Sequence, residues 1–198
     1  SRPGGAGTIF IRAGSDPGGV VLIDNGGRHG AWTPLEMPQR LDVTLARGAV
    51  GYSAGEISVR SLVMNGAELR KTGSRISDRL RLSASGNLIV SGSSRIVGNC
   101  TLSAAGNALI EAGSEISADA DGYGPAQGPG AGGTGAVLGG GAGHGAAGSP
   151  NGDGFPGLPY GSPTNPVEPG SGGGGVSSYP GTGPGGTGGG VIRLDVGG

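Results

Sequence analysis

The sequence predicts an all-β protein: a right-handed parallel β-helix (a β-solenoid) followed by a C-terminal bundle of glycine-rich, polyglycine-II-type helices. The first observation is composition, because 50 glycines and 14 prolines among 198 residues argue against an ordinary helical enzyme. The second is a repeat of about 20 residues in the middle of the chain, which is typical of solenoids. The third is a long block in which glycine recurs at every third residue.

Residues 1–40 form a strand-rich segment. The runs TIFIRA (8–13) and VVLID (20–24) are short and apolar, with turn-forming glycines nearby, as is usual for strands. We expect this segment to pair with a neighbouring unit or to continue it. Ile9, Phe10 and Ile11 form its predicted assembly edge.

Residues 41–121 form the predicted β-solenoid, with about 20 residues per coil. Apolar patches alternate with small polar residues and end in Gly, Ser or Asn, which is typical of strands. Stacked coils would place like residues about 4.8 Å apart. A small antiparallel sandwich with coincidental spacing is the alternative. The expected core positions recur at twenty-residue spacing: Leu62, Leu82 and Leu102; Leu69, Ile89 and Leu109; and Ile76, Ile96 and Ile116.

Residues 122–190 hold 29 glycines and 10 prolines but no Lys or Arg. A three-residue period matches a polyproline-II-type helix, which has three residues per turn. Glycine at every third place leaves a bare stripe, so neighbouring helices can approach until their backbone groups hydrogen-bond. Irregular coil wrapped on the solenoid is the alternative. The glycines of this frame are Gly124, Gly130, Gly133, Gly139, Gly145, Gly148, Gly154 and Gly157.

Residues 191–198 form a predicted linking strand. The string GGTGGGVIRLDVGG (185–198) shares with GGAGTIFIRAG (4–14) a glycine run that leads into a short apolar strand containing Arg. The end of one unit therefore looks like the start of another. Val191, Ile192 and Leu194 form the second predicted assembly edge, and the predicted partner is another copy of the chain, joined head to tail.

Three strings resemble a known kind of protein: GAGHGAAG (141–148), YGSPTNPVEPGSGGGG (160–175) and GGTGGGVIRLDV (185–196). They are similar to glycine-rich modules that occur in tandem in very large secreted and cell-surface proteins, mostly bacterial. The resemblance covers residues 122–196 well and the solenoid more loosely. It implies a structural or adhesive role outside the cell and no enzymatic activity.

Charge and cysteine content restrict the possible partners. With 13 basic and 14 acidic residues, the net charge of −1 gives no electrostatic footprint for nucleic acid or an anionic membrane. Nor does any apolar run reach the length of about 18 residues needed for membrane insertion. The single Cys100 excludes an internal disulfide, and we expect its side chain to be buried.

The sequence assigns no catalytic or cofactor-binding residue. Arg75, Arg95 and Glu115 recur at twenty-residue spacing, and a β-helix polysaccharide lyase needs a charged cluster of this kind, but a solvated charged edge explains them more simply. Asp119 and Asp121 are calcium candidates, because they supply carboxylates at alternate positions, although further ligands are missing.

These observations predict a non-enzymatic extracellular structural protein, a subunit or repeat unit of a self-assembling fibre or surface appendage. A glycan- or ice-binding adhesin module is the alternative, and surface glycans would then contact exposed aromatic side chains. A β-helix polysaccharide lyase or hydrolase is the second alternative. The aromatic candidates are Trp32, Tyr123, Tyr160 and Tyr179.

Overall fold

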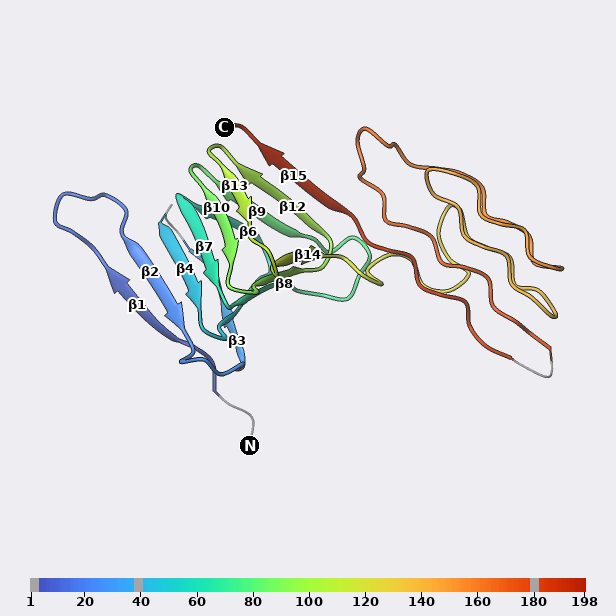
Figure 1. The fold of residues 1–198 in the computed structure, drawn as a ribbon, viewed down its shortest axis with the longest axis horizontal. Helices are drawn as coiled ribbons and strands as arrows, with labels where there is room; N and C mark the ends of the chain where they lie inside the picture. The colour runs from blue at the N-terminus through green and yellow to red at the C-terminus, as the bar shows by residue number, and fades with distance from the viewer. Residues whose placement is uncertain (1–3, 38–40, 179–181) are drawn as a thin grey trace. The chain divides into compact units, whose positions relative to one another are not determined.

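The computed structural model describes residues 4–37, 41–178 and 182–198. These residues form fifteen strands in three sheets and no helix, which confirms the predicted all-β class (Figure 1). In particular, the described part of the chain has no helix of the length and apolarity required to cross a membrane.

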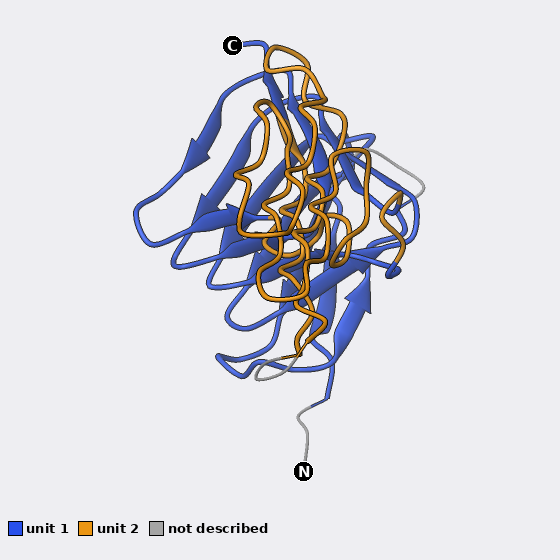
Figure 2. Cartoon of the chain, turned by 90° about the vertical axis from the view of Figure 1, so that its right-hand side faces the viewer, with its two compact units in different colours: residues 1–74, 78–117, 194–198 blue, residues 75–77, 118–193 orange. Residues whose placement is uncertain are grey.

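The chain divides into two compact units, coloured separately in Figure 2. The strand unit comprises residues 1–74, 78–117 and 194–198, and the glycine unit comprises residues 75–77 and 118–193. The strand unit thus includes the N-terminal segment and the end of the C-terminal strand, both of which the sequence pattern separates from the solenoid.

The first sheet has six strands. Its first two strands are antiparallel, and every later pair is parallel. In order across the sheet they are β1 (Gly7–Ile11), β2 (Val20–Asp24), β4 (Asp42–Ala46), β7 (Ser61–Asn65), β10 (Leu88–Ser91) and β13 (Ala108–Ile110).

The other two sheets contain the remaining strands. The second sheet consists of β3 (Trp32–Pro34), β5 (Val50–Ser53), β8 (Glu68–Lys71), β11 (Arg95–Val97) and β14 (Glu115–Ser117), all joined in parallel. The third sheet consists of β6 (Glu56–Val59), β9 (Leu80–Ala84), β12 (Cys100–Ala104) and β15 (Ile192–Val196).

The chain visits the three sheets in rotation. We call one such passage a coil: β4, β5 and β6 form one coil, and β7 to β9, β10 to β12 and β13 to β15 form the next three. Sharp corners between strands need backbone conformations that glycine adopts most easily, and Gly48 and Gly66 have φ of 83° and 64° at two of them. The last coil is interrupted between β14 and β15, where the chain leaves to form the glycine unit.

Alternate residues of the strands point inward and form one hydrophobic core. Leu82 and Leu102 lie opposite one another in the third sheet and are 2 % and 0 % exposed. Cys100 is fully buried at the start of β12. The core is aliphatic, with Leu, Ile, Val, Ala, Met and Cys side chains, as the low aromatic content requires.

The twenty-residue register is correct only for the later coils. Leu82 pairs with Leu102, and Ile96 pairs with Ile116, as predicted. Leu62, however, lies opposite Leu88 rather than Leu82, and the partner of Leu82 on its other side is Ile57. The cause is the longer connection from β8 to β9, residues 72–79, which adds residues to that coil.

Three of the predicted core positions are corrected by this register. Ile76 lies in residues 75–77, outside the strands, and Leu69 takes the place opposite Ile96. Ile89 and Leu109 are paired with each other but alternate with the buried positions, so their side chains face outward. Leu109 is 49 % exposed. Leu62, Leu69, Leu82, Leu102 and Ile96 lie in the core, and Ile116 packs against it.

The glycine unit is held by hydrogen bonds between the backbones of separate segments. A strand in a sheet bonds to two neighbours at most, yet the segment 170–176 bonds to three other segments of this unit. Examples are Tyr123 N–H to Gly170 O at 2.8 Å, Gly174 N–H to Gly140 O at 2.9 Å and Gly173 N–H to Gly186 O at 2.9 Å.

The predicted bundle of polyglycine-II-type helices is not seen as helices. The described part of residues 122–190 carries turns, bends and isolated bridges but no assigned helix. The structure shows a network of backbone hydrogen bonds in this unit and the close approach of glycines from different segments.

Candidate assembly site

The last coil leaves one end of the strand unit with unpaired edges. β13, β14 and β15 are each the final strand of their sheet among the described residues. Two inward-facing side chains of β15, Leu194 and Val196, are 37 % and 46 % exposed. Their counterparts in β12, Leu102 and Ala104, are 0 % and 3 % exposed, because the following strand covers them. An apolar surface therefore lies open at this end.

Hydrogen bonds fix the register of β15. Gly197 N–H donates to Ala104 O at 2.9 Å, just as Ala105 N–H donates to Ala84 O at 2.9 Å one strand earlier. Val196 thus lies beside Ala104, and Leu194 beside Leu102. The strings LRLSA (80–84), CTLSA (100–104) and IRLDV (192–196) stack in this register, a signal that comparison of these three strings would have revealed.

β1 forms an edge at the other end of the first sheet. All five of its residues are exposed, and Ile9, Phe10 and Ile11 are 54 %, 54 % and 60 % exposed. Gly19, with φ of 139°, lets the Phe10 ring approach the start of β2, because a Cβ there would lie 2.7 Å from the ring. The side chains that the sequence assigns to this edge are thus at a sheet edge.

A clamp of three charged side chains holds the loop between β1 and β2. The Arg60 guanidinium donates to the Asp42 carboxylate at 2.6 and 2.9 Å and to the Asp16 carboxylate at 3.1 and 3.2 Å. Hydrogen bonds from Arg60, and then from Gly18 N–H, hold the pKa of Asp16 below its ordinary value. Hydrogen bonds to Asp42 and Asp16 raise the pKa of Arg60, so Arg60 and Asp16 both stay charged at neutral pH.

The two predicted assembly edges lie on different sheets. β1 borders the first sheet, whereas Ile192 and Leu194 belong to β15 at the border of the third. β15 also pairs with β12 of its own chain, so only one of its edges is open among the described residues. Val191 precedes β15 and is buried at 4 % exposure. The sequence pattern did not identify Leu109 and Ile110 as edge residues, although they lie on β13 at the open end.

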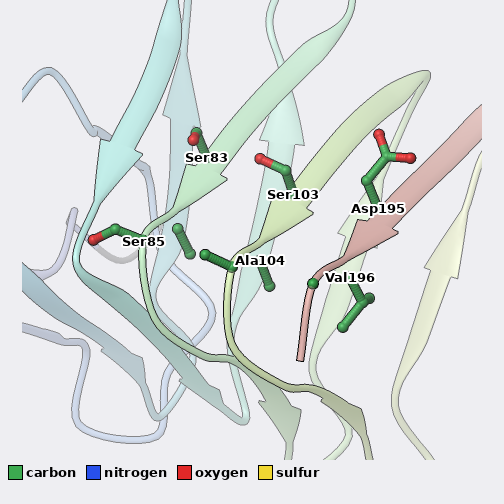
Figure 3. Close-up of a pocket in the computed structure, with 9 residues that line it drawn as sticks. Ser83, Ser85, Ser103, Ala104, Asp195 and Val196 are labelled. Atoms are coloured by element: carbon green, nitrogen blue, oxygen red, sulfur yellow. The ribbon is translucent and has the colours of Figure 1, made fainter.

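A cavity of about 380 Å³ opens at the ends of β9, β12 and β15 (Figure 3). Ser83, Ser103 and Asp195 come from these three strands and point to the same side of the sheet. Two hydroxyls and a carboxylate in a row can hydrogen-bond the hydroxyls of a sugar. Binding of a glycan stays a prediction.

The aromatic candidates for glycan contacts are not gathered on one unit. Trp32 is 56 % exposed on β3 of the strand unit, where its ring lies 5.8 Å from that of Tyr52. Tyr123 and Tyr160 belong to the glycine unit, where Tyr160 packs edge-on against His144. Tyr179 lies outside the described residues.

Charged side chains of opposite sign alternate across the strands of the second sheet. Arg95 donates to Glu115 at 2.5 Å, the pairing that the twenty-residue spacing predicts. The residue opposite Arg95 on its other side is Glu68 rather than Arg75. Glu68 also contacts Arg70 and lies 3.6 Å from His29. This alternation of opposite charges stabilises stacked strands.

The calcium candidates Asp119 and Asp121 lie at the start of the glycine unit. Within the described ranges, the structure contains no group of three or more His, Cys, Asp or Glu side chains arranged to hold a metal ion. Calcium has a preference for six to eight oxygen ligands. The two carboxylates and the other described side chains therefore supply too few ligands for such a site.

The predicted glycine frame coincides in large part with close backbone contacts. A Cβ at six of the eight frame glycines would lie within 3.0 Å of atoms from other segments, which are backbone atoms in nearly every case. Gly124 and Gly145 are the exceptions, because neither has such a neighbour. Glycines outside the frame, such as Gly132 and Gly140, are equally close to neighbouring backbone.

Asp153 stabilises a turn in the glycine unit. Its carboxylate accepts hydrogen bonds from the N–H groups of Ala136, Val137 and Leu138, the last two at 3.2 Å. These bonds, that from Ala136 first, lower the pKa of Asp153 below its ordinary value of 3.8. The lowered pKa means that the ionised carboxylate contributes stability above the pKa of the unfolded chain, and that this stability is lost as the pH falls through the lower pKa of the folded state.

We therefore expect amide hydrogen exchange at Ala136, Val137 and Leu138 to accelerate, relative to the intrinsic rate, as the pH falls below about 4. In the Asp153→Asn variant this protection should be weaker at neutral pH and change little with pH over the same range. Exchange measured by mass spectrometry on peptides around residue 137 tests this. Equal acid sensitivity in both proteins would contradict the role of this carboxylate.

Comparison with known proteins found no match among protein-family models, curated proteins or solved structures.

Proposed function

We propose that the protein is a non-enzymatic structural subunit that assembles end to end into an extracellular fibre or surface appendage. The observation that carries the proposal is the contrast between successive strands of one sheet. Leu102 is fully buried, whereas Leu194, in the same position of the next coil, is 37 % exposed. A second copy packed on this end would cover Leu194, as the next coil covers each earlier one.

In this proposal the strand unit is a right-handed parallel β-helix, or β-solenoid. The rotation of the chain through three sheets and the parallel register support it, and parallel crossovers are almost always right-handed. The glycine unit is a bundle of polyglycine-II-type helices. Hydrogen bonds from one segment to three others support this, because threefold screw symmetry directs backbone groups to several neighbours.

The direction of assembly follows from the arrangement of the open edges. Three sheets end together at β13, β14 and β15, and a second copy related by translation along the stack brings its own first strands, β1, β3 and β6, to this end. A two-fold axis can map only one of the three sheets onto itself. Contacts that repeat in one direction do not close, and they give filaments. The resemblance of residues 122–196 to tandem cell-surface modules supports an extracellular location.

Sedimentation velocity and electron microscopy on the purified chain test the proposal. We expect species that grow with concentration, and fibres with a constant axial repeat. A single 18.8 kDa species from micromolar to millimolar concentration would contradict end-to-end assembly. The matched variant Leu194→Asp places a charge on the open surface, and we expect it to remain monomeric under the same conditions.

A further inference from the structure

We propose that β1 of one copy adds, in antiparallel orientation, to the open edge of β13 of the next copy. This inference rests on the proposed end-to-end assembly and names the strands and the side chains that join the copies. β1 and β13 are the two end strands of the same six-stranded sheet. Joining them continues that sheet from copy to copy, as peptides do when they add to an exposed sheet edge.

One inward-facing row of the first sheet shows how the two strands fit. In register across the sheet, the row runs Phe10, Val21, Val43, Leu62, Leu88 and Ala108. Its four middle members are at most 6 % exposed, whereas Phe10 at the β1 end is 54 % exposed. The row therefore ends in the largest side chain at one edge and in the smallest at the other.

This difference in size is complementary when copies stack. Ala108 occupies the position that Leu62 and Leu88 hold in the two preceding coils, so the last coil has room above it. A Phe10 ring from the next copy would fill that room and lose its exposure. Two β13 edges joined together would leave the space empty, and two β1 edges would crowd two rings, so the fit favours head-to-tail contact.

The outward-facing row next to it supports the same pairing. It runs Ile9, Leu22, Thr44, Val63, Ile89 and Leu109, with one residue from each strand of the sheet. Ile9 and Leu109, at its two ends, are 54 % and 49 % exposed. The antiparallel register that seats Phe10 against Ala108 also places Ile9 directly opposite Leu109 of the neighbour. Each would then cover the other, as cross-strand apolar pairs do.

Disulfide formation between two single-cysteine variants tests the pairing. Cys100 is fully buried, so Ile9→Cys and Leu109→Cys each introduce one accessible thiol at an exposed position. Directly opposite residues of antiparallel strands lie within the range of Cα separations that a disulfide requires. We expect oxidation of an equimolar mixture to give mainly the mixed dimer, identified by mass spectrometry, and each variant alone to give little dimer.

The outcomes separate this inference from the proposed function. Dimers from Ile9→Cys alone indicate head-to-head contact, and dimers from Leu109→Cys alone indicate tail-to-tail contact, and either as the main product overturns the inference. Fibres without mixed dimers overturn the inference but leave end-to-end assembly in place. Absence of both fibres and mixed dimers overturns both. Ile11→Cys, on the same face but two residues away, is the matched off-register control.

Exchanging the large and small side chains at positions 10 and 108 tests independently whether Phe10 packs against Ala108 of the next copy. We expect Phe10→Ala to raise the critical concentration for assembly about tenfold or more, because an anchor side chain is lost. Ala108→Phe alone should also impair assembly, since two rings would then meet. The double variant restores one ring per contact, and we expect it to assemble within a few fold of the native protein. A double variant as defective as the two single variants combined would overturn the proposed fit.

Discussion

Replacing Gly157 by Ala is expected to unfold the glycine unit or to destabilise it by about 3 kcal/mol or more. A Cβ at this position would lie within 3.0 Å of Gly130 O and Gly143 N, two backbone atoms on neighbouring segments. Backbone atoms cannot rotate away as a side chain can. The segments would have to separate, and the hydrogen bond from Gly157 N–H to Gly141 O, at 2.9 Å, would be lost with them.

Gly145→Ala is the matched control, because Gly145 belongs to the same three-residue frame but a Cβ there would meet no atom of another segment within 4 Å. We expect its effect on stability to stay within about 1 kcal/mol, because the lower entropy of the unfolded chain offsets any small cost in the folded state. Thermal unfolding followed by circular dichroism, with hydrogen exchange to separate the two units, measures both variants. Equal stability of the two variants would contradict close packing of backbones at Gly157.

The sequence predicts which glycines matter only in part, because a single three-residue frame includes only some of the glycines that lie close to other segments. The frame that begins at Gly124 identifies Gly157 and Gly130, which contact each other, but it also includes Gly145, where a Cβ would contact nothing within 4 Å. Gly140 and Gly174 are equally close to the backbone of another segment, although neither is in phase with this frame. The direction in which each bare stripe faces depends on neighbours that are distant in sequence.

The register of the strand unit was harder to predict than its fold class. β7 and β9 both present alternating apolar residues followed within a few positions by glycine, so stacking by similarity aligned Leu62 with Leu82. The two strands belong to different sheets of the same coil. Two similar strands within one coil can therefore be mistaken for the same strand in successive coils. The extra residues of the connection 72–79 place Leu82 of β9 twenty residues after Leu62 of β7, which is the spacing expected of a true repeat. The later coils have no such insertion, and there the spacing is correct.

The sheet edge at β1 was predictable from the sequence, and the edge at β15 was less so. An apolar run of Ile9, Phe10 and Ile11 after glycines indicates a strand from sequence alone, and its likeness to residues 191–196 indicates an edge. The sheet to which each edge belongs depends on the register, and an error in register moves an edge to another sheet. The glycine unit lies between β14 and β15 in the sequence, and this separation hid the continuity of Leu102 with Leu194.

Replacing Leu102 by Ala is expected to reduce the free energy of unfolding of the strand unit by about 3 to 5 kcal/mol, because it leaves a cavity in a core position that is 0 % exposed. Chemical denaturation of dilute protein measures this loss. Leu82→Ala, one strand away and 2 % exposed, is expected to cost a similar amount. A loss below about 1 kcal/mol for both variants would contradict a single packed core.

The same substitution at Leu194 should behave differently, because this side chain extends the row of Leu82 and Leu102 but is 37 % exposed. In dilute protein we expect Leu194→Ala to cost about 1 to 2 kcal/mol, well below the loss at Leu102, since the side chain is only partly buried and leaves no enclosed cavity. In concentrated protein this substitution should raise the critical concentration for assembly, because a second copy would bury the Leu194 side chain in the assembled state. A loss at Leu194 as large as that at Leu102 in dilute protein would mean that the row is completed within one chain, and the open end would then not be the surface that joins copies.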